Sequence, residues 1–120
     1  MKPSIPVLLV DDDASNLLTL TALLEEEGFE VVAARSIREA RAVVEASGVF
    51  SAALVDRNLD GDDGLALAAE LRASAASSIV FILSGDPPES DMPEGIDGWL
   101  LKGISAYELI RQVRASLQAR

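Results

Sequence analysis

Residues 5–13 read IPVLLVDDD, an apolar run that stops at three aspartates. A run with so little polar alternation is typical of a strand covered on both faces, as in a parallel sheet flanked by helices. Similar runs recur along the chain and alternate with segments of helical spacing. This alternation predicts an α/β fold with a doubly wound parallel sheet. We expect strands at residues 5–10, 31–34, 52–55, 79–83 and 98–101.

Helix signals follow four of these strands. Leucines at helical spacing begin at Leu17, with Asp13 or Ser15 as the N-cap. Ser36 and Glu39 form a capping-box pattern at the start of the next helix. Further helices are expected over residues 64–73 and from residue 106 onward. The interval 85–97 contains three prolines, which lack the N–H that a helix interior needs, so we expect a loop or an irregular turn there.

The composition is consistent with one acidic domain over residues 1–120. The chain has 20 acidic and 10 basic residues, a net charge of −10, and neither His nor Cys. These counts exclude disulfides, thiolate zinc sites and histidine-based nucleophilic catalysis. The negative charge argues against direct binding of nucleic acid. Because no apolar run approaches the ~20 residues of a membrane helix, we expect a cytoplasmic protein with no membrane partner.

Polar side chains stand where the predicted strands end. Asp11 and Asp12 follow the first strand, Asp56 the third, Ser84 the fourth and Lys102 the fifth. Ligands of open parallel sheets gather at the carboxyl ends of the strands, so these side chains are expected to converge. Crowded carboxylates favour a hard divalent cation, and we predict Mg²⁺, for which Mn²⁺ can substitute.

This set of groups suits phosphoryl transfer. Phosphoryl transfer mainly requires that the phosphoryl group is positioned and that the charge on its oxygens is neutralised. An aspartate nucleophile beside a divalent cation, a lysine and a hydroxyl donor meets both requirements. Asp56 is then the nucleophile, with Lys102 and Ser84 contacting the phosphoryl oxygens. The carbonyl of Asn58 is a further candidate metal ligand.

Four motifs occur in a fixed order: VLLVDDD, LVDRNLDGDDGLAL, FILSGD and GWLLKG. In this order they resemble the receiver domain of two-component response regulators, over essentially the whole chain. The resemblance implies a flavodoxin-like sheet of five strands in the order 2-1-3-4-5. It implies that the domain accepts a phosphoryl group from a phosphohistidine in a Mg²⁺-dependent reaction and signals through protein contacts. A receiver domain catalyses only its own phosphorylation and dephosphorylation, so we expect no other enzymatic activity.

The resemblance also assigns roles and partners. The phosphoryl donor is a histidine kinase or a histidine phosphotransfer protein, and the signal passes to a downstream protein partner. Asp56 is implied to be the phosphoacceptor, with Lys102 and Ser84 assisting. The metal ligands are Asp11, Asp12, Asp56 and the backbone carbonyl of Asn58, and the switch residues are Ser84 and Trp99.

The sequence departs from the family pattern at three places. Gly103 replaces the usual proline after the lysine, Asp60 replaces the proline of the loop after Asp56, and the fourth helix of the family is shortened or missing. The shortened or missing fourth helix and Gly103 leave a second hypothesis open, a degenerate receiver that acts as a phosphorylation-independent interaction module. A phosphatase of the haloacid-dehalogenase type is a weaker alternative, because that class carries its nucleophile on the first strand.

Overall fold

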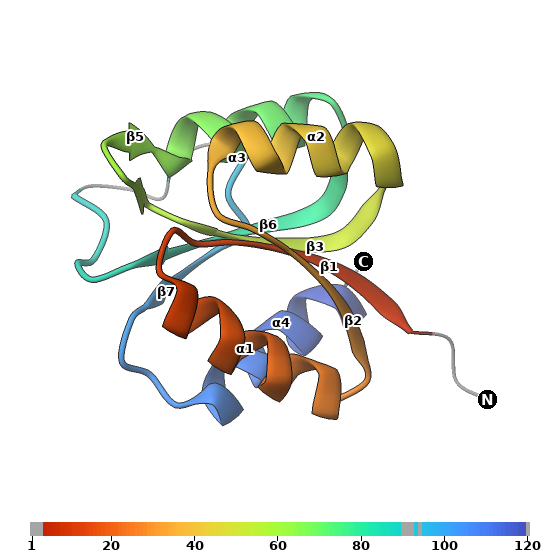
Figure 1. Ribbon diagram of the computed structural model, residues 1–120. Coiled ribbons are helices and arrows are strands. Elements are labelled where there is room, and N and C mark those ends of the chain that lie inside the picture. Colours follow the sequence, from red (N-terminus) through yellow and green to blue (C-terminus); the bar gives the residue numbers. More distant parts are fainter. Residues whose placement is uncertain (1–3, 90–92, 94, 120) are drawn as a thin grey trace.

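A five-stranded parallel sheet forms the centre of the molecule, with helices packed on both of its faces (Figure 1). The computed structural model describes residues 4–89, 93 and 95–119. The strand order is β2-β1-β3-β6-β7, which confirms the predicted order 2-1-3-4-5 of the main strands. The elements are β1 (Ile5–Val10), α1 (Ala14–Glu26), β2 (Phe29–Ala34), α2 (Ile37–Ser47), β3 (Phe50–Asp56), β4 (Asn58–Leu59), β5 (Asp62–Asp63), α3 (Gly64–Ala73), β6 (Ser77–Ser84), β7 (Gly98–Leu101) and α4 (Ala106–Gln118).

Successive strand residues point to opposite faces and build two separate apolar layers. On β1, Val7 and Leu9 join the layer that includes Leu17 of α1 and Val113 of α4. Leu8 belongs to the other layer, which contains residues of α2 and α3. Burial on both faces explains why the strands are apolar without alternation.

β1, β7 and α3 have the predicted boundaries, whereas β2, β3 and β6 extend one or two residues beyond the predicted strands. β2 begins at Phe29, two residues earlier than predicted, because Phe29 pairs with Ile5 at the start of β1. Asp13 is the N-cap of α1, and its carboxylate accepts hydrogen bonds from the N–H groups of Ser15 and Asn16. Asp13 rather than Ser15 is therefore the cap.

No helix is assigned to the described residues between β6 and β7, as the prolines predicted; residues 90–92 and 94 lie outside the described part of the chain. The carboxylate of Asp97 holds the end of this segment by accepting the Val80 N–H at 2.7 Å and pairing with Arg72 at 2.8 Å. The indole N–H of Trp99 donates to the Asp86 carbonyl at 2.8 Å. The segment is thus tied to α3, β6 and β7.

A short hairpin of β4 and β5 separates β3 from α3. Its two tip residues, Asp60 and Gly61, have φ values of 50° and 93°. Positive φ at both positions is the signature of the type I′ turn, which favours Asp-Gly. Proline has φ fixed near −65° and cannot occupy this conformation. The turn geometry therefore explains why Asp60 stands where the family usually has proline.

Candidate functional site

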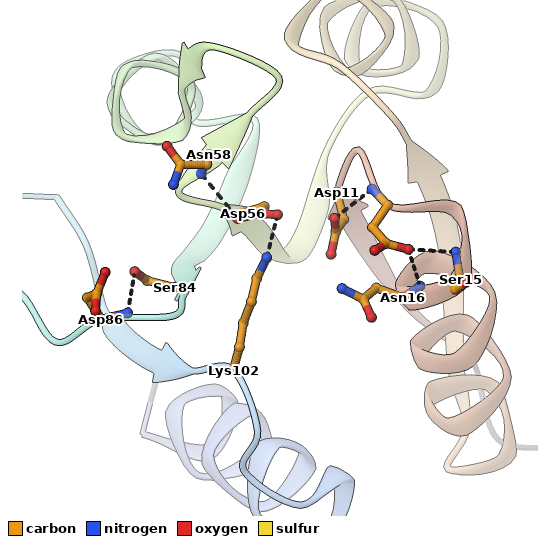
Figure 2. A network of polar contacts seen from close by, with 9 residues as sticks. Asp11, Ser15, Asn16, Asp56, Asn58, Ser84, Asp86 and Lys102 are labelled. Carbon is orange, nitrogen blue, oxygen red and sulfur yellow. Dashed lines mark hydrogen bonds and ion pairs between the residues drawn. The ribbon is translucent and has the colours of Figure 1, made fainter.

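The sheet register brings the predicted side chains to one edge of the sheet (Figure 2). Val10 pairs with Val55, so Asp11 and Asp56 follow adjacent positions on neighbouring strands. Ser84 pairs with Leu101, and the Lys102 N–H donates to the Ser84 carbonyl at 2.7 Å. Parallel strands that end in register place their terminal residues side by side. Fold topology alone therefore gathers these four residues.

Burial singles out the same residues. Among the described residues, four polar or charged side chains are buried: Asp11, Asp56, Ser77 and Ser84. Ser77 lies at the opposite end of β6 and donates to the Ile79 carbonyl. The other three lie at the site. A buried carboxylate is costly unless it is paired or binds a cation, so the clustering of two aspartates here points to chemistry rather than packing.

The Asp56 carboxylate is held at both oxygens. Oδ2 accepts from Lys102 Nζ at 2.8 Å, and Oδ1 accepts from the Asn58 N–H at 3.1 Å. Burial alone would lower the pKa of Lys102, but the bond to Asp56 and the nearby negative charges outweigh burial, so its pKa is raised. Lys102 thus stays protonated, with 39% of its side chain exposed.

Asp11, Asp12 and Asp56 form a compact acidic cluster, in which each residue offers an oxygen within 4.8 Å of the others. Burial raises the pKa of Asp11 to about 6; the hydrogen bond from the Asp13 N–H opposes this rise, and the charge of Asp56 adds to it. Three carboxylate oxygens with one nearby ammonium leave uncompensated negative charge. The donor set is all oxygen, which fits a hard divalent cation such as Mg²⁺.

Ser84 and Trp99 are both hydrogen-bonded to the backbone of Asp86. The Ser84 hydroxyl accepts the Asp86 N–H at 3.2 Å, so its own proton remains available for a further acceptor. The Trp99 side chain is half-buried, and its indole N–H is satisfied by the Asp86 carbonyl. The indole is therefore anchored within the domain rather than fully exposed. Its switch role stays a prediction.

Sequence reasoning missed Arg57, which directly follows Asp56. Its guanidinium carbon lies 5.9 Å from the centre of the Trp99 ring, and its Nε lies 3.5 Å from the Asp63 carboxylate. A cation over an aromatic face is a favourable contact, and together with the Asp63 ion pair it links the residue after β3 to β5 and β7. Only the alternation of side chains after Asp56 could have indicated it, because Arg57 must point to the opposite face.

Comparison with known proteins agrees with this arrangement. The sequence profile of the response regulator receiver domain matches residues 7–114. The chain belongs to this family. A solved receiver domain from Methylobacillus flagellatus is 27% identical, with a TM-score of 0.79, and covers 93% of this chain and 98% of that one. A CheY-like receiver domain from Methanospirillum hungatei has a TM-score of 0.88 at 24% identity, covering 97% and 95% of the two chains.

Curated relatives of this receiver domain are longer proteins. The alginate biosynthesis regulator AlgB of Pseudomonas aeruginosa is 32% identical over 94% of this chain, and RegX3 of Mycolicibacterium smegmatis is 34% identical over 93%. The chain spans 28% of AlgB and 50% of RegX3. Within the part of the chain that the structure describes, no helix is both long and apolar enough to cross a membrane.

The raised pKa of Asp11 predicts a pH dependence of stability in the receiver domain without divalent cations. An aspartate in an unfolded chain has a pKa of about 3.9, whereas that of Asp11 is about 6. The folded state therefore binds the proton more tightly than the unfolded chain. The resulting contribution to the free energy of unfolding is lost as the pH rises through about 6. Lowering the pH from 7.5 to 5 should stabilise the fold by about 1 kcal/mol through this group.

Urea unfolding in EDTA at the two pH values measures the gain, and Asp11→Asn is the matched variant. Asn has no proton to gain, so the variant should lose about 1 kcal/mol of the pH dependence. An equal gain in the wild type and in Asp11→Asn would show that other groups cause it.

Proposed function

We propose that this receiver domain is a phosphorylatable switch of a two-component or phosphorelay system, with Asp56 as the phosphoacceptor. A carboxylate oxygen of Asp56 attacks the phosphorus of a phosphohistidine on a histidine kinase or a histidine phosphotransfer protein. The P–N bond breaks as the O–P bond forms, and the imidazole leaves with the bonding electron pair. The observation that carries the proposal is the buried Asp56 carboxylate, 2.8 Å from Lys102 Nζ and beside two further aspartates.

Each neighbour has a proposed role in that step. Lys102 neutralises charge on the phosphoryl oxygens, because its ammonium is already fixed at Asp56. The Ser84 hydroxyl, which has a proton to donate, would meet another oxygen. Trp99 would respond through Asp86, to which both Ser84 and Trp99 are bonded. The output is a change of protein contacts with a downstream partner.

We also propose a Mg²⁺ site at the acidic cluster, with Asp11, Asp12, Asp56 and the carbonyl of Asn58 as ligands and Mn²⁺ as a substitute. Receiver domains generally bind Mg²⁺ at an acidic pocket, and the carboxylates present here fit that ion. When bound, the cation neutralises negative charge on the phosphoryl oxygens. Asp11 and Asp12 hold no other cation within ion-pair distance among the described residues, which leaves them available for it.

Incubation with acetyl phosphate, with and without Mg²⁺, tests the function directly. We expect intact-mass measurement to show the gain of one phosphoryl group when Mg²⁺ is present and no gain in EDTA. Phosphohistidine on a histidine kinase then tests the physiological class of donor. A wild-type protein that gains no phosphoryl group from either donor would favour the alternative, a phosphorylation-independent interaction module. The altered segment between β6 and β7 is the observation that favours that alternative.

Mg²⁺ should raise the stability of the fold, because it binds the folded acidic cluster and not the unfolded chain. At a free concentration of 100 times its dissociation constant, the gain is about 2.7 kcal/mol, or roughly 10 °C in Tm for a chain of this size. Thermal unfolding at constant ionic strength, with NaCl as the control, measures the effect. Asp12→Asn should reduce the shift and Asp62→Asn, an exposed hairpin residue, should not. A Tm that Mg²⁺ leaves unchanged contradicts the metal site.

Lys102→Met should slow phosphorylation by acetyl phosphate about 100-fold, because the transition state loses a fixed positive charge. Arg111→Met is the control: Arg111 pairs with Glu108 on the exposed surface of α4, and its loss should leave the rate unchanged. The rates are measured at saturating Mg²⁺ on protein whose Tm has been checked. A Lys102→Met rate within a factor of two of the wild-type rate would remove Lys102 from the reaction.

A further inference from the structure

A groove of about 320 Å³ lies between α1 and the connection from β7 to α4, and it is lined by Lys102, the ion-pair partner of Asp56. The groove is lined by Asp11 and Lys102, together with Asn16 and Thr19 of α1. Lys102 is bonded to Asp56, and Asp11 belongs to the same acidic cluster. Much of the remaining lining is apolar and includes Leu20, Leu23, Leu101 and Ile104. We call this space the side groove. Its polar residues are the groups that a phosphoryl donor entering from this side would meet.

Asn16 differs from the charged residues around the site because it is neutral. It is half-buried, and its backbone N–H donates to the Asp13 carboxylate at 3.2 Å, which fixes the residue in the first turn of α1. Figure 2 shows its carboxamide directed towards the gap between Asp11 and Lys102. Within the described residues, the carboxamide makes no hydrogen bond. It therefore offers an acceptor and two donors at the mouth of the site.

This placement matters for the leaving group, if the proposed function holds. In phosphoryl transfer the attacking and leaving atoms lie in line on opposite sides of phosphorus. Lys102 is already committed to the Asp56 side. The leaving group therefore departs on the side of phosphorus away from Asp56, and we take this to be the side that Asn16 borders. The aspartates of the site are reserved for the cation and the nucleophile. The carboxamide of Asn16 is therefore the neutral acceptor available to the leaving group.

We propose that the Asn16 carboxamide orients the donor by accepting a hydrogen bond from the ring N–H of its imidazole. The donor reacts with a proton on the ring nitrogen that does not carry phosphorus. When the P–N bond breaks, its electron pair goes to the nitrogen that carried phosphorus. The second nitrogen keeps its proton, and a neutral imidazole leaves. Acetyl phosphate has no N–H at its leaving group. Asn16 thereby selects phosphoimidazole-type donors over acyl phosphates.

The test compares two small donors, phosphoimidazole and acetyl phosphate, on the full chain with Mg²⁺. Asn16→Ala should lower the rate with phosphoimidazole by about fivefold to tenfold, roughly the effect of one lost hydrogen bond, and change the acetyl phosphate rate less than about twofold. Thr19→Ala, in the same groove, should change neither rate. Asn16→Ser, which keeps an acceptor oxygen, should recover part of the phosphoimidazole rate.

The outcomes separate this inference from the function on which it rests. Equal losses with both donors would mean that Asn16 acts on the fold or on Asp56, and unchanged rates would mean that it does not touch the donor; either result overturns the inference. A wild-type chain that takes a phosphoryl group from neither donor would instead overturn the proposed function.

Discussion

Asp56→Asn is expected to abolish the phosphoryl adduct that the wild-type receiver domain forms with acetyl phosphate and Mg²⁺. A carboxamide is not a nucleophile for phosphorus under these conditions, so the loss should be complete rather than partial. The change is nearly isosteric, and the Asn side-chain oxygen can still accept one of the hydrogen bonds that Lys102 Nζ and the Asn58 N–H now make to Asp56. The site therefore keeps its shape and loses its nucleophile.

Asp60→Asn is the matched control for this experiment. Asp60 lies four residues later at the exposed hairpin tip, with φ of 50°, a conformation that asparagine also tolerates. It should be phosphorylated at the wild-type rate. An adduct on Asp56→Asn would show that another acid, such as Asp11 or Asp12, accepts the phosphoryl group, and would contradict the assignment of Asp56.

The sheet and the convergence of the site residues were predictable because both depend on short-range patterns. Asp11 and Asp56 each end an apolar run, and parallel strands necessarily bring such ends to one edge. The sequence therefore predicted which residues lie together, although it gave no interatomic distances. The burial of the two aspartates followed from the same pattern, since each continues a strand that is covered on both faces.

The contacts between the strand ends were not predictable in the same way. The Arg57–Trp99 contact joins residues 42 positions apart, and the Val80–Asp97 bond spans 17. Both depend on how the segment before β7 crosses the sheet edge, which no local pattern specifies. The β4–β5 hairpin was missed for a different reason. Asp60-Gly61 is a recognised type I′ signal, but two-residue strands carry no measurable hydrophobic period.

Gly64 shows how closely the backbone itself approaches the site. Its N–H donates to the Arg57 carbonyl at 2.7 Å, and a Cβ at residue 64 would lie 1.9 Å from the Asp56 carbonyl oxygen and 2.9 Å from the Asp56 carbonyl carbon. These neighbours are backbone atoms of β3, so no side chain can rotate to make room. The first residue of α3 therefore has to be glycine for α3 to begin against the end of β3.

Gly64→Ala should destabilise the fold by about 3 kcal/mol, the upper range for overpacking a closed site, and should slow phosphorylation because relief of the clash displaces Asp56. Gly85→Ala is the matched control: Gly85 lies next to Ser84, a Cβ added there would meet no heavy atom within 4 Å beyond its chain neighbours, and its φ is not positive. Its free energy of unfolding should stay within about 0.5 kcal/mol of the wild type. Urea unfolding with Mg²⁺ compares the two variants. Equal stability of Gly64→Ala and Gly85→Ala would mean that α3 can move away from β3 at little cost, and that this backbone contact does not hold Asp56 in place.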